Sequence, residues 1–209
     1  MSADTVTADI FLIELEYREQ DFGAVRAALA RLIVNLPVQK HEAEAFALLA
    51  KPVITVYLQN AGKLAKSAVA AAAAKLAPLA ADTIEVCGLK LIATHAGAAA
   101  GQSADYHYVV RTDVERGAEA ELERWYDEEH MPMLAAVPGT VRARRLRSLD
   151  AKPRFYACYD LVSPGVLESA EWLRARQTPW SQQVRPTFRN TRRVISKRLP
   201  LFGTGVNPA

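Results

Sequence analysis

Residues 140–162, TVRARRLRSLDAKPRFYACYDLV, decide the fold of this chain, because they form the pattern of two strands joined by a short turn. Residues 140–149 and 153–162 alternate in polarity, as strands with two different faces do. Asp150 to Pro153 supply the turn. One face of the second strand carries Phe155, Ala157, Tyr159 and Leu161, and the other carries Arg154, Tyr156, Cys158 and Asp160. Polar groups on paired strands suit a polar-lined cavity on one side of the sheet.

The hairpin lies in the middle of a longer order of elements. Residues 105–114 predict a strand before it, and residues 118–134 predict a helix that joins this strand to the hairpin. Residues 163–188 are helical but broken at Pro179 and Pro186, and residues 192–199 predict a last strand. This order, β-α-β-β-α-β, is that of a ferredoxin-like module.

The first half of the chain fits the same order. Residues 8–19, 53–58 and 82–95 predict strands, and Phe11, Ile13, Leu15 and Tyr17 form an apolar face that should meet a core. Two helices are expected, residues 21–36, which Pro37 ends, and the alanine-rich residues 60–81, which Asn60 opens as a cap. Residues 44–50 are compatible with helix or strand, and the module is complete if they form a strand.

The two halves are separated by AGAAAGQSA, residues 96–104, whose small side chains suit a flexible linker. We therefore expect a degenerate module at 1–95, a second module at 105–199 and a C-terminal tail at 200–209. A ferredoxin-like sheet has helices on one face only, and its open apolar face needs a partner. The predicted fold is α+β, with two tandem ferredoxin-like modules whose antiparallel sheets pack face to face as an α/β barrel.

Composition limits the partners that this chain can have. The net charge of +3 is modest, and the arginine-rich residues 142–147 and 185–198 alternate charge with apolar side chains as strands do, which argues against nucleic acid. No apolar run is long enough to cross a bilayer, and the N-terminus does not resemble a signal peptide. Cys87 and Cys158 lie in apolar runs and are expected to be small buried side chains. We expect a cytoplasmic protein without membrane or nucleic-acid partners.

The helix at 118–134 contains RWYDEEHMPML, residues 124–134, which gathers most of the candidate site residues. At 100° per residue, Trp125, Tyr126 and Met133 fall on one apolar stripe with Leu122. The same projection puts Glu129 in the middle of this stripe and His130 at its edge. Asp127 and Glu128 point to solvent, and Pro132 should kink or end the helix.

Each candidate in this helix has a structural and a functional interpretation. Glu129 either forms an ion pair with a strand arginine or is a carboxyl group of raised pKa that transfers protons. His130 either caps the last turn or is a general acid or base. Trp125 and Tyr126 are core residues or line a small-molecule cavity. In the strand at 105–114, His107 is either a surface residue or a second cavity residue.

Several common sites are absent from the sequence. It has no GxGxxG, P-loop, GxSxG or HExxH motif, and its four histidines lack metal-ligand spacing. We therefore expect neither a metal nor a nucleotide cofactor.

The stretch RWYDEEHMPMLAAVPGTVRARRLRS, followed by PRFYACYDLVSP, resembles the EthD-like and related proteins of the dimeric α/β-barrel superfamily. The resemblance covers residues 105–198. It is carried by the pattern W-Y-x-x-x-H-x-P-x-L, then V-P-G, then an arginine-bearing and a tyrosine-bearing strand. The superfamily includes cofactor-free monooxygenases, cyclases, isomerases, dehydratases and haem enzymes, so the resemblance implies a fold and not a reaction. No residue here marks a haem ligand.

The site residues and the resemblance together lead us to expect a small-molecule-binding α/β-barrel protein. We expect it to be an enzyme that acts by acid/base chemistry on a small, mostly apolar organic molecule, as a lyase, isomerase, cyclase or cofactor-free monooxygenase. We expect no cofactor and a homodimer. His130 is the expected acid or base, with Glu129 or Asp127 orienting it, and the expected substrate-binding residues are Trp125, Tyr126, Arg145, Tyr156, Tyr159 and His107. The alternatives are a non-catalytic ligand-binding or assembly protein and a nucleic-acid binder that uses the arginine strands.

Overall fold

The computed structural model describes residues 7–60 and 62–202, and the chain is α+β. The strand order is β1-β3-β2-β8-β5-β7-β6-β4, which closes on itself as a barrel. The chain divides into two compact units, Met1–Lys90 with Lys197–Ala209, and Leu91–Ser196. β4 (Ala80–Ala96) and β8 (Phe188–Arg198) each contribute residues to both units. The strand order and the antiparallel pairing confirm the predicted fold class.

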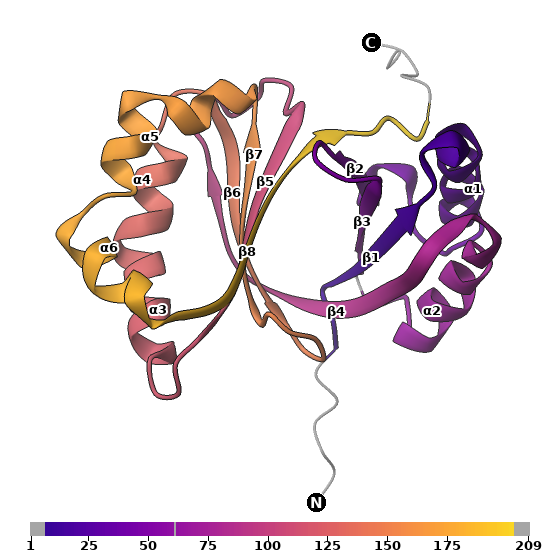
Figure 1. Cartoon of the computed structure of the whole chain (residues 1–209), viewed down its shortest axis with the longest axis horizontal. Helices are drawn as coiled ribbons and strands as arrows, with labels where there is room; N and C mark the ends of the chain where they lie inside the picture. Colours follow the sequence, from indigo (N-terminus) through magenta and orange to yellow (C-terminus); the bar gives the residue numbers. More distant parts are fainter. Residues whose placement is uncertain (1–6, 61, 203–209) are drawn as a thin grey trace, which may run out of the picture. The chain divides into compact units, whose positions relative to one another are not determined.

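The N-terminal unit contains β1 (Ile10–Tyr17), β2 (Ala43–Leu48), β3 (Val53–Gln59) and the first part of β4 (Figure 1). β1 pairs antiparallel with both β3 and β4. Its two helices are α1 (Phe22–Val34) and α2 (Lys66–Ala74). As predicted, alternate side chains of β1 enter the core, where they join residues of both helices; the core includes Phe11, Ile13, Leu15, Tyr17, Leu29, Ile33 and Val69.

The structure of this unit decides one alternative that the sequence left open, and it differs from the sequence-based prediction in one helix. Residues 44–50 contribute a strand, because β2 pairs with β3 along its length. The expected helix at 60–81 is wrong at both ends, since α2 begins only at Lys66 and β4 begins at Ala80. Asn60 does not cap the helix; its side-chain oxygen accepts hydrogen bonds from the amides of Lys63 and Leu64 and so closes a loop before it.

The C-terminal unit is built on β5 (Tyr106–Val114), β6 (Thr140–Ser148), β7 (Phe155–Leu161) and most of β8. β7 lies between β5 and β6 and pairs antiparallel with both. Helices cover one face of this sheet (Figure 1). They are α3 (Glu119–Trp125), the π-helical turn η4 (Tyr126–His130), α4 (Met131–Ala135), α5 (Ala170–Ala175) and α6 (Pro179–Val184).

The faces of β7 are those that the sequence predicts. Phe155, Ala157, Tyr159 and Leu161 lie in the core beneath the helices, together with Leu122. The alternate residues occupy the opposite face, and all seven residues of the strand are buried. Short 3-10 turns complete the chain at Glu19–Asp21, Lys40–Glu42, Ala77–Leu79, Pro164–Glu168 and Arg185–Thr187.

Residues 97–99, in the segment expected to be a linker, form backbone hydrogen bonds inside the C-terminal unit. The amides of Gly97 and Ala99 donate to Val141 and Thr140 in β6, and that of Ala98 donates to Ala135 in α4. At the other end of the chain, Leu201 and Phe202 pack against the core of the N-terminal unit, and residues 203–209 of the expected tail lie outside the described residues.

Both cysteines are buried, as expected, and neither forms a disulfide. Burial raises the pKa of the Cys158 thiol to about 12, so it is an inert core residue. Among the described residues, no helix combines the length and apolar character needed to cross a membrane.

Candidate functional site

α3, η4 and α4 form one continuous helix whose middle turn is π-helical. The π turn ends at His130, shortly before Pro132, which has no amide hydrogen to continue the α-helical pattern. The wider turn changes the angle between successive side chains, so the projection at 100° per residue is wrong here. Met133, expected in the apolar stripe, is 39% exposed, whereas His130 and Met131 are buried.

The two carboxylates expected to orient His130 have other partners. Oε1 of Glu129 accepts a hydrogen bond of 2.5 Å from the Thr178 hydroxyl. Oδ1 of Asp127 accepts one of 2.7 Å from Arg145. In the described part of the chain, neither carboxylate forms a hydrogen bond or ion pair with His130, and the structure therefore does not assign them that role.

His130 is held by ring stacking. Its imidazole lies 4.0 Å from the Trp125 indole, centroid to centroid, with the planes 19° apart, and Tyr126 contacts it edge-on. The side chain is 6% exposed, and its Nδ1 has no hydrogen-bond partner among the described residues. A buried polar atom without a partner is rare and calls for a physical explanation.

His130 lines a small pocket between the sheet and the helices of the C-terminal unit. The free space is about 30 Å³, enough for a water molecule or a small polar group. Half of its lining residues are Tyr, Trp or Phe: Tyr108, Trp125, Tyr126, Tyr159, Trp172 and Phe188. This space is far too small to hold a haem.

Arg176, Arg185 and Arg193 also line this pocket. No carboxylate within the described ranges forms an ion pair with any of the three, and the charge of Arg193 acts on the Tyr108 hydroxyl. Burial first, and then the charges of Arg185 and Arg176, together lower the pKa of His130 to about 3. The pocket is therefore electropositive, and its histidine is neutral at pH 7.

Two tyrosines supply neutral hydroxyl groups to the same pocket. Burial raises the pKa of Tyr126 and of Tyr159, so both remain protonated. The Tyr159 hydroxyl donates to the Met131 sulfur at 3.3 Å. A thioether is a weak acceptor, so this hydroxyl can turn to a better one at little cost.

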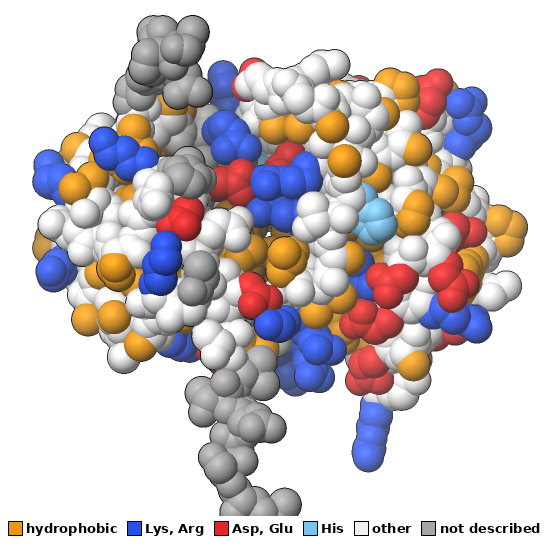
Figure 2. Space-filling model, turned by 180° about the vertical axis from the view of Figure 1, so that it is seen from behind, with side chains coloured by type: hydrophobic (Ala, Val, Ile, Leu, Met, Phe, Trp, Pro, Cys, Tyr) orange, Lys and Arg blue, Asp and Glu red, His pale blue; other side chains and the backbone are white. Residues whose placement is uncertain are grey.

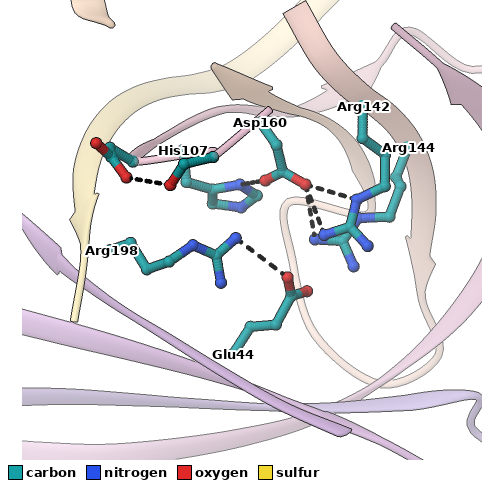
Figure 3. Close-up of polar contacts among 8 residues, drawn as sticks. Glu44, His107, Arg142, Arg144, Asp160 and Arg198 are labelled. Carbon is teal, nitrogen blue, oxygen red and sulfur yellow. Dashed lines mark hydrogen bonds and ion pairs between the residues drawn. The ribbon is translucent and has the colours of Figure 1, made fainter. Parts of the chain in front are cut away.

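The opposite face of the same sheet carries a second polar cluster, formed by His107, Asp160, Arg142 and Arg144 (Figure 3). Nδ1 of His107 lies 2.7 Å from Oδ1 of Asp160, and Arg142 donates to Oδ2 of Asp160 at 2.6 Å. Arg144 lies 3.8 Å from the same oxygen. Burial raises the pKa of Asp160, but the hydrogen bond and charge of His107 and the two arginines outweigh burial and hold it below its usual value.

The predicted site residues are thus divided between two faces of one sheet. Trp125, Tyr126, His130 and Tyr159 meet at the pocket. His107 and Tyr156 lie on the other face, where the Arg111 guanidinium is 5.2 Å from the Tyr156 ring centre.

Arg145 is on the helix-covered face but is already neutralised. Its guanidinium pairs with Glu123 and Asp127 and lies 4.7 Å from the centre of the Tyr126 ring. It holds the helix to the sheet.

The arginines of the pocket were not predicted as site residues from the sequence. Residues 185–198 were identified as rich in arginine, but the alternation of their charges was attributed only to a strand. Arg193 reaches Tyr108 because β8 is the neighbour of β5 in the sheet. The available signal was a run of arginines with too few acidic residues nearby to neutralise them.

No family model matches this chain, and no curated protein sequence matches it. Solved structures do. A provisionally named monooxygenase from Fusobacterium nucleatum is 11% identical, with a TM-score of 0.64 over 93% of this chain and 94% of that one. An anthrone oxidase-like protein is 12% identical, with a TM-score of 0.64 over 91% of each chain. A mutant chlorite dismutase from Candidatus Nitrospira defluvii is 11% identical, with a TM-score of 0.64 over 94% of each chain.

These similarities extend over nearly the whole of each chain, and they show that this chain has the fold of the ferredoxin-like α/β-barrel proteins. At such low identity they show the fold alone. Among the described residues, no group of three or more His, Cys, Asp or Glu side chains is placed to hold a metal ion.

Proposed function

We propose that this chain is an enzyme that binds a small organic molecule at the His130 pocket and acts on it by proton transfer. The observation that carries the proposal is a buried imidazole that lines a pocket and has an unpartnered Nδ1. The reaction classes that suit such a site are those of a lyase, isomerase, cyclase or cofactor-free oxygenase. We also propose that the chain is related to the EthD-like proteins, which residues 105–198 resemble.

The residues of the pocket have distinct roles in this scheme. His130, neutral at pH 7, accepts a proton from the substrate and returns it. Tyr159 turns its hydroxyl from Met131 to a substrate oxygen and stabilises charge that develops there. Trp125 fixes the plane of the imidazole by stacking.

The named activities of the structural neighbours support an enzyme. They are described as a provisionally named monooxygenase, an anthrone oxidase-like protein and a chlorite dismutase. One architecture therefore serves several chemistries, and the residues of the pocket must select the reaction here.

A second candidate is a non-catalytic ligand-binding or assembly protein, which the small free volume of the pocket favours. A nucleic-acid binder has less support, since acidic and basic side chains are interspersed on the face shown in Figure 2. A cytoplasmic homodimer remains our expectation, and light scattering on the purified chain tests the oligomeric state.

The test of the enzyme is a comparison of His130→Gln with the wild type. Each protein is incubated with a mixed small-molecule extract, and consumed and formed compounds are followed by mass spectrometry. We expect conversions by the wild type that His130→Gln loses and that the matched control His95→Gln, altered outside the pocket, retains. Equal conversion by a folded His130→Gln variant would overturn the proposal, and a protein that binds a compound without converting it would be the ligand-binding alternative.

A further inference from the structure

We infer that Arg176, Arg185 and Arg193 form, with His130, a binding site for the carboxylate head of a small organic acid. This inference deepens the proposed function, on which it rests for the identity of the site, by naming the class of substrate. It places the carboxylate in the free space of the pocket, with the remainder of the molecule toward solvent.

The first argument is the contrast between arginines of the same unit. Arg142 pairs with Asp160, and Arg145 pairs with Glu123 and Asp127. The three pocket arginines line one space without a carboxylate of the chain among the described residues. Burial lowers the pKa of Arg185, and the charges of Arg176 and Arg193 lower it as well. Three like charges around one small space are stabilised by an anion placed between them.

The second argument is independent of the arginines. Nδ1 of His130 and Nε1 of Trp125 are both buried without a hydrogen-bond partner among the described residues, and both side chains line the pocket. The indole nitrogen can only donate, and a neutral imidazole can donate from Nδ1. An acceptor-only group such as a carboxylate matches these donors.

The size of the pocket and the chemistry of its lining residues favour a carboxylate over other anions. A free space of about 30 Å³ admits a planar carboxylate more easily than a tetrahedral phosphate. Guanidinium groups bind carboxylates through two parallel hydrogen bonds. Arg193 is exposed, so the ligand can continue past it, along the rings of Tyr108 and Phe188.

A bound carboxylate also changes the chemistry of His130. The groups that face it are Arg176, Arg185, Arg193, Tyr108, Tyr126 and Tyr159, and none of them is negatively charged at pH 7. An anion among them offsets the positive charge and raises the pKa of His130, which makes the imidazole a better base once the substrate is bound.

The experiment is a nuclear magnetic resonance titration of the full-length protein with acetate. Its uncharged analogue acetamide is the control ligand, and the Trp125 indole signal, assigned with Trp125→Phe, is the reporter. We expect acetate to shift this signal saturably in the millimolar range and acetamide to leave it unchanged. Arg185→Gln and Arg193→Gln should each weaken acetate binding about tenfold or more, because each removes a charged hydrogen-bond donor. The exposed Arg174→Gln should not change it.

Equal shifts by acetate and acetamide, no saturable shift by acetate, or undiminished binding to both folded arginine variants would overturn the inference. Saturation by inorganic phosphate but not by acetate would also overturn it, in favour of a different anion. The outcome is separate from that of the enzyme test. If His130→Gln loses turnover but the wild type does not bind acetate, the proposed enzyme function is supported and the carboxylate site is overturned. If the wild type binds acetate but turnover does not depend on His130, the carboxylate site is supported and the proposed enzyme function is overturned.

Discussion

Nδ1 of His107 and Oδ1 of Asp160 lie 2.7 Å apart, with side chains only 1% and 2% exposed. The pair joins β5 to β7 at directly opposed positions. Arg142 shares the other carboxylate oxygen, so one buried anion holds together side chains from three neighbouring strands. This arrangement identifies Asp160 as a structural centre of the C-terminal unit.

Asp160→Asn should lower the free energy of unfolding by about 3–5 kcal/mol, because it removes the charge of the buried carboxylate that His107, Arg142 and Arg144 share. Urea unfolding measures the change. Asp127→Asn is the matched control and should cost about 1 kcal/mol or less, since Asp127 is largely exposed and Arg145 keeps Glu123. Equal effects of the two substitutions would contradict this role for Asp160.

The stability of the protein should fall on acidification because of His130. Its pKa is lowered to about 3 in the folded protein from 6.5, so the unfolded chain binds more protons between these values. Stability is therefore greatest above about pH 6.5 and decreases toward pH 3, by up to about 1.4 kcal/mol per pH unit. Urea unfolding at several pH values should show a shallower dependence for His130→Gln than for His95→Gln. The same slope in both variants would be the contrary result.

Arg145→Gln tests the distinction between a substrate-binding and a structural arginine. It should lower stability by about 1–3 kcal/mol, because hydrogen bonds to Glu123 and Asp127 are lost. Acetate affinity at the pocket should remain as in the wild type. If Arg145→Gln weakened acetate binding as much as Arg185→Gln does, Arg145 would belong to the site after all.

Gly97→Ala tests whether the segment after β4 is packed. An added Cβ would lie 2.0 Å from the backbone oxygen of Thr140, so the chain must shift, and we expect a loss of about 2–4 kcal/mol in thermal or urea unfolding. Gly23→Ala, in α1, meets nothing within 4 Å and should be neutral or stabilising by up to about 1 kcal/mol. A harmless Gly97→Ala would show that residues 97–99 are free to move.

Much of the fold follows from local patterns in the sequence. The alternation in residues 153–162 identifies both faces of β7, because the side chains of a strand point alternately to opposite sides. The ends of α2 were not predictable in this way. Alanine favours helix at every position of this segment. Ala80 nevertheless lies in a strand, because it pairs with Tyr17, which is distant in sequence.

The site was less predictable than the fold. Trp125, Tyr126 and His130 were identified from their helix, but the π turn moved Glu129 and Met133 away from their expected positions. The arginine cluster brings together Arg176, which follows α5, Arg185, and Arg193 of β8. No local pattern in the sequence shows that these three residues line one pocket. His130 and His107 were both expected at one cavity, because the sequence does not reveal that they lie on opposite faces of one sheet.

We expect small molecules to bind at the His130 pocket and not at the His107 face. The most direct test of this expectation is to soak crystals of the wild-type protein in a set of small aromatic and aliphatic carboxylates and to determine where they bind. We predict a carboxylate beside His130, bound by Arg185 and its neighbours. A ligand bound at His107 and Asp160, with the His130 pocket empty, would contradict it.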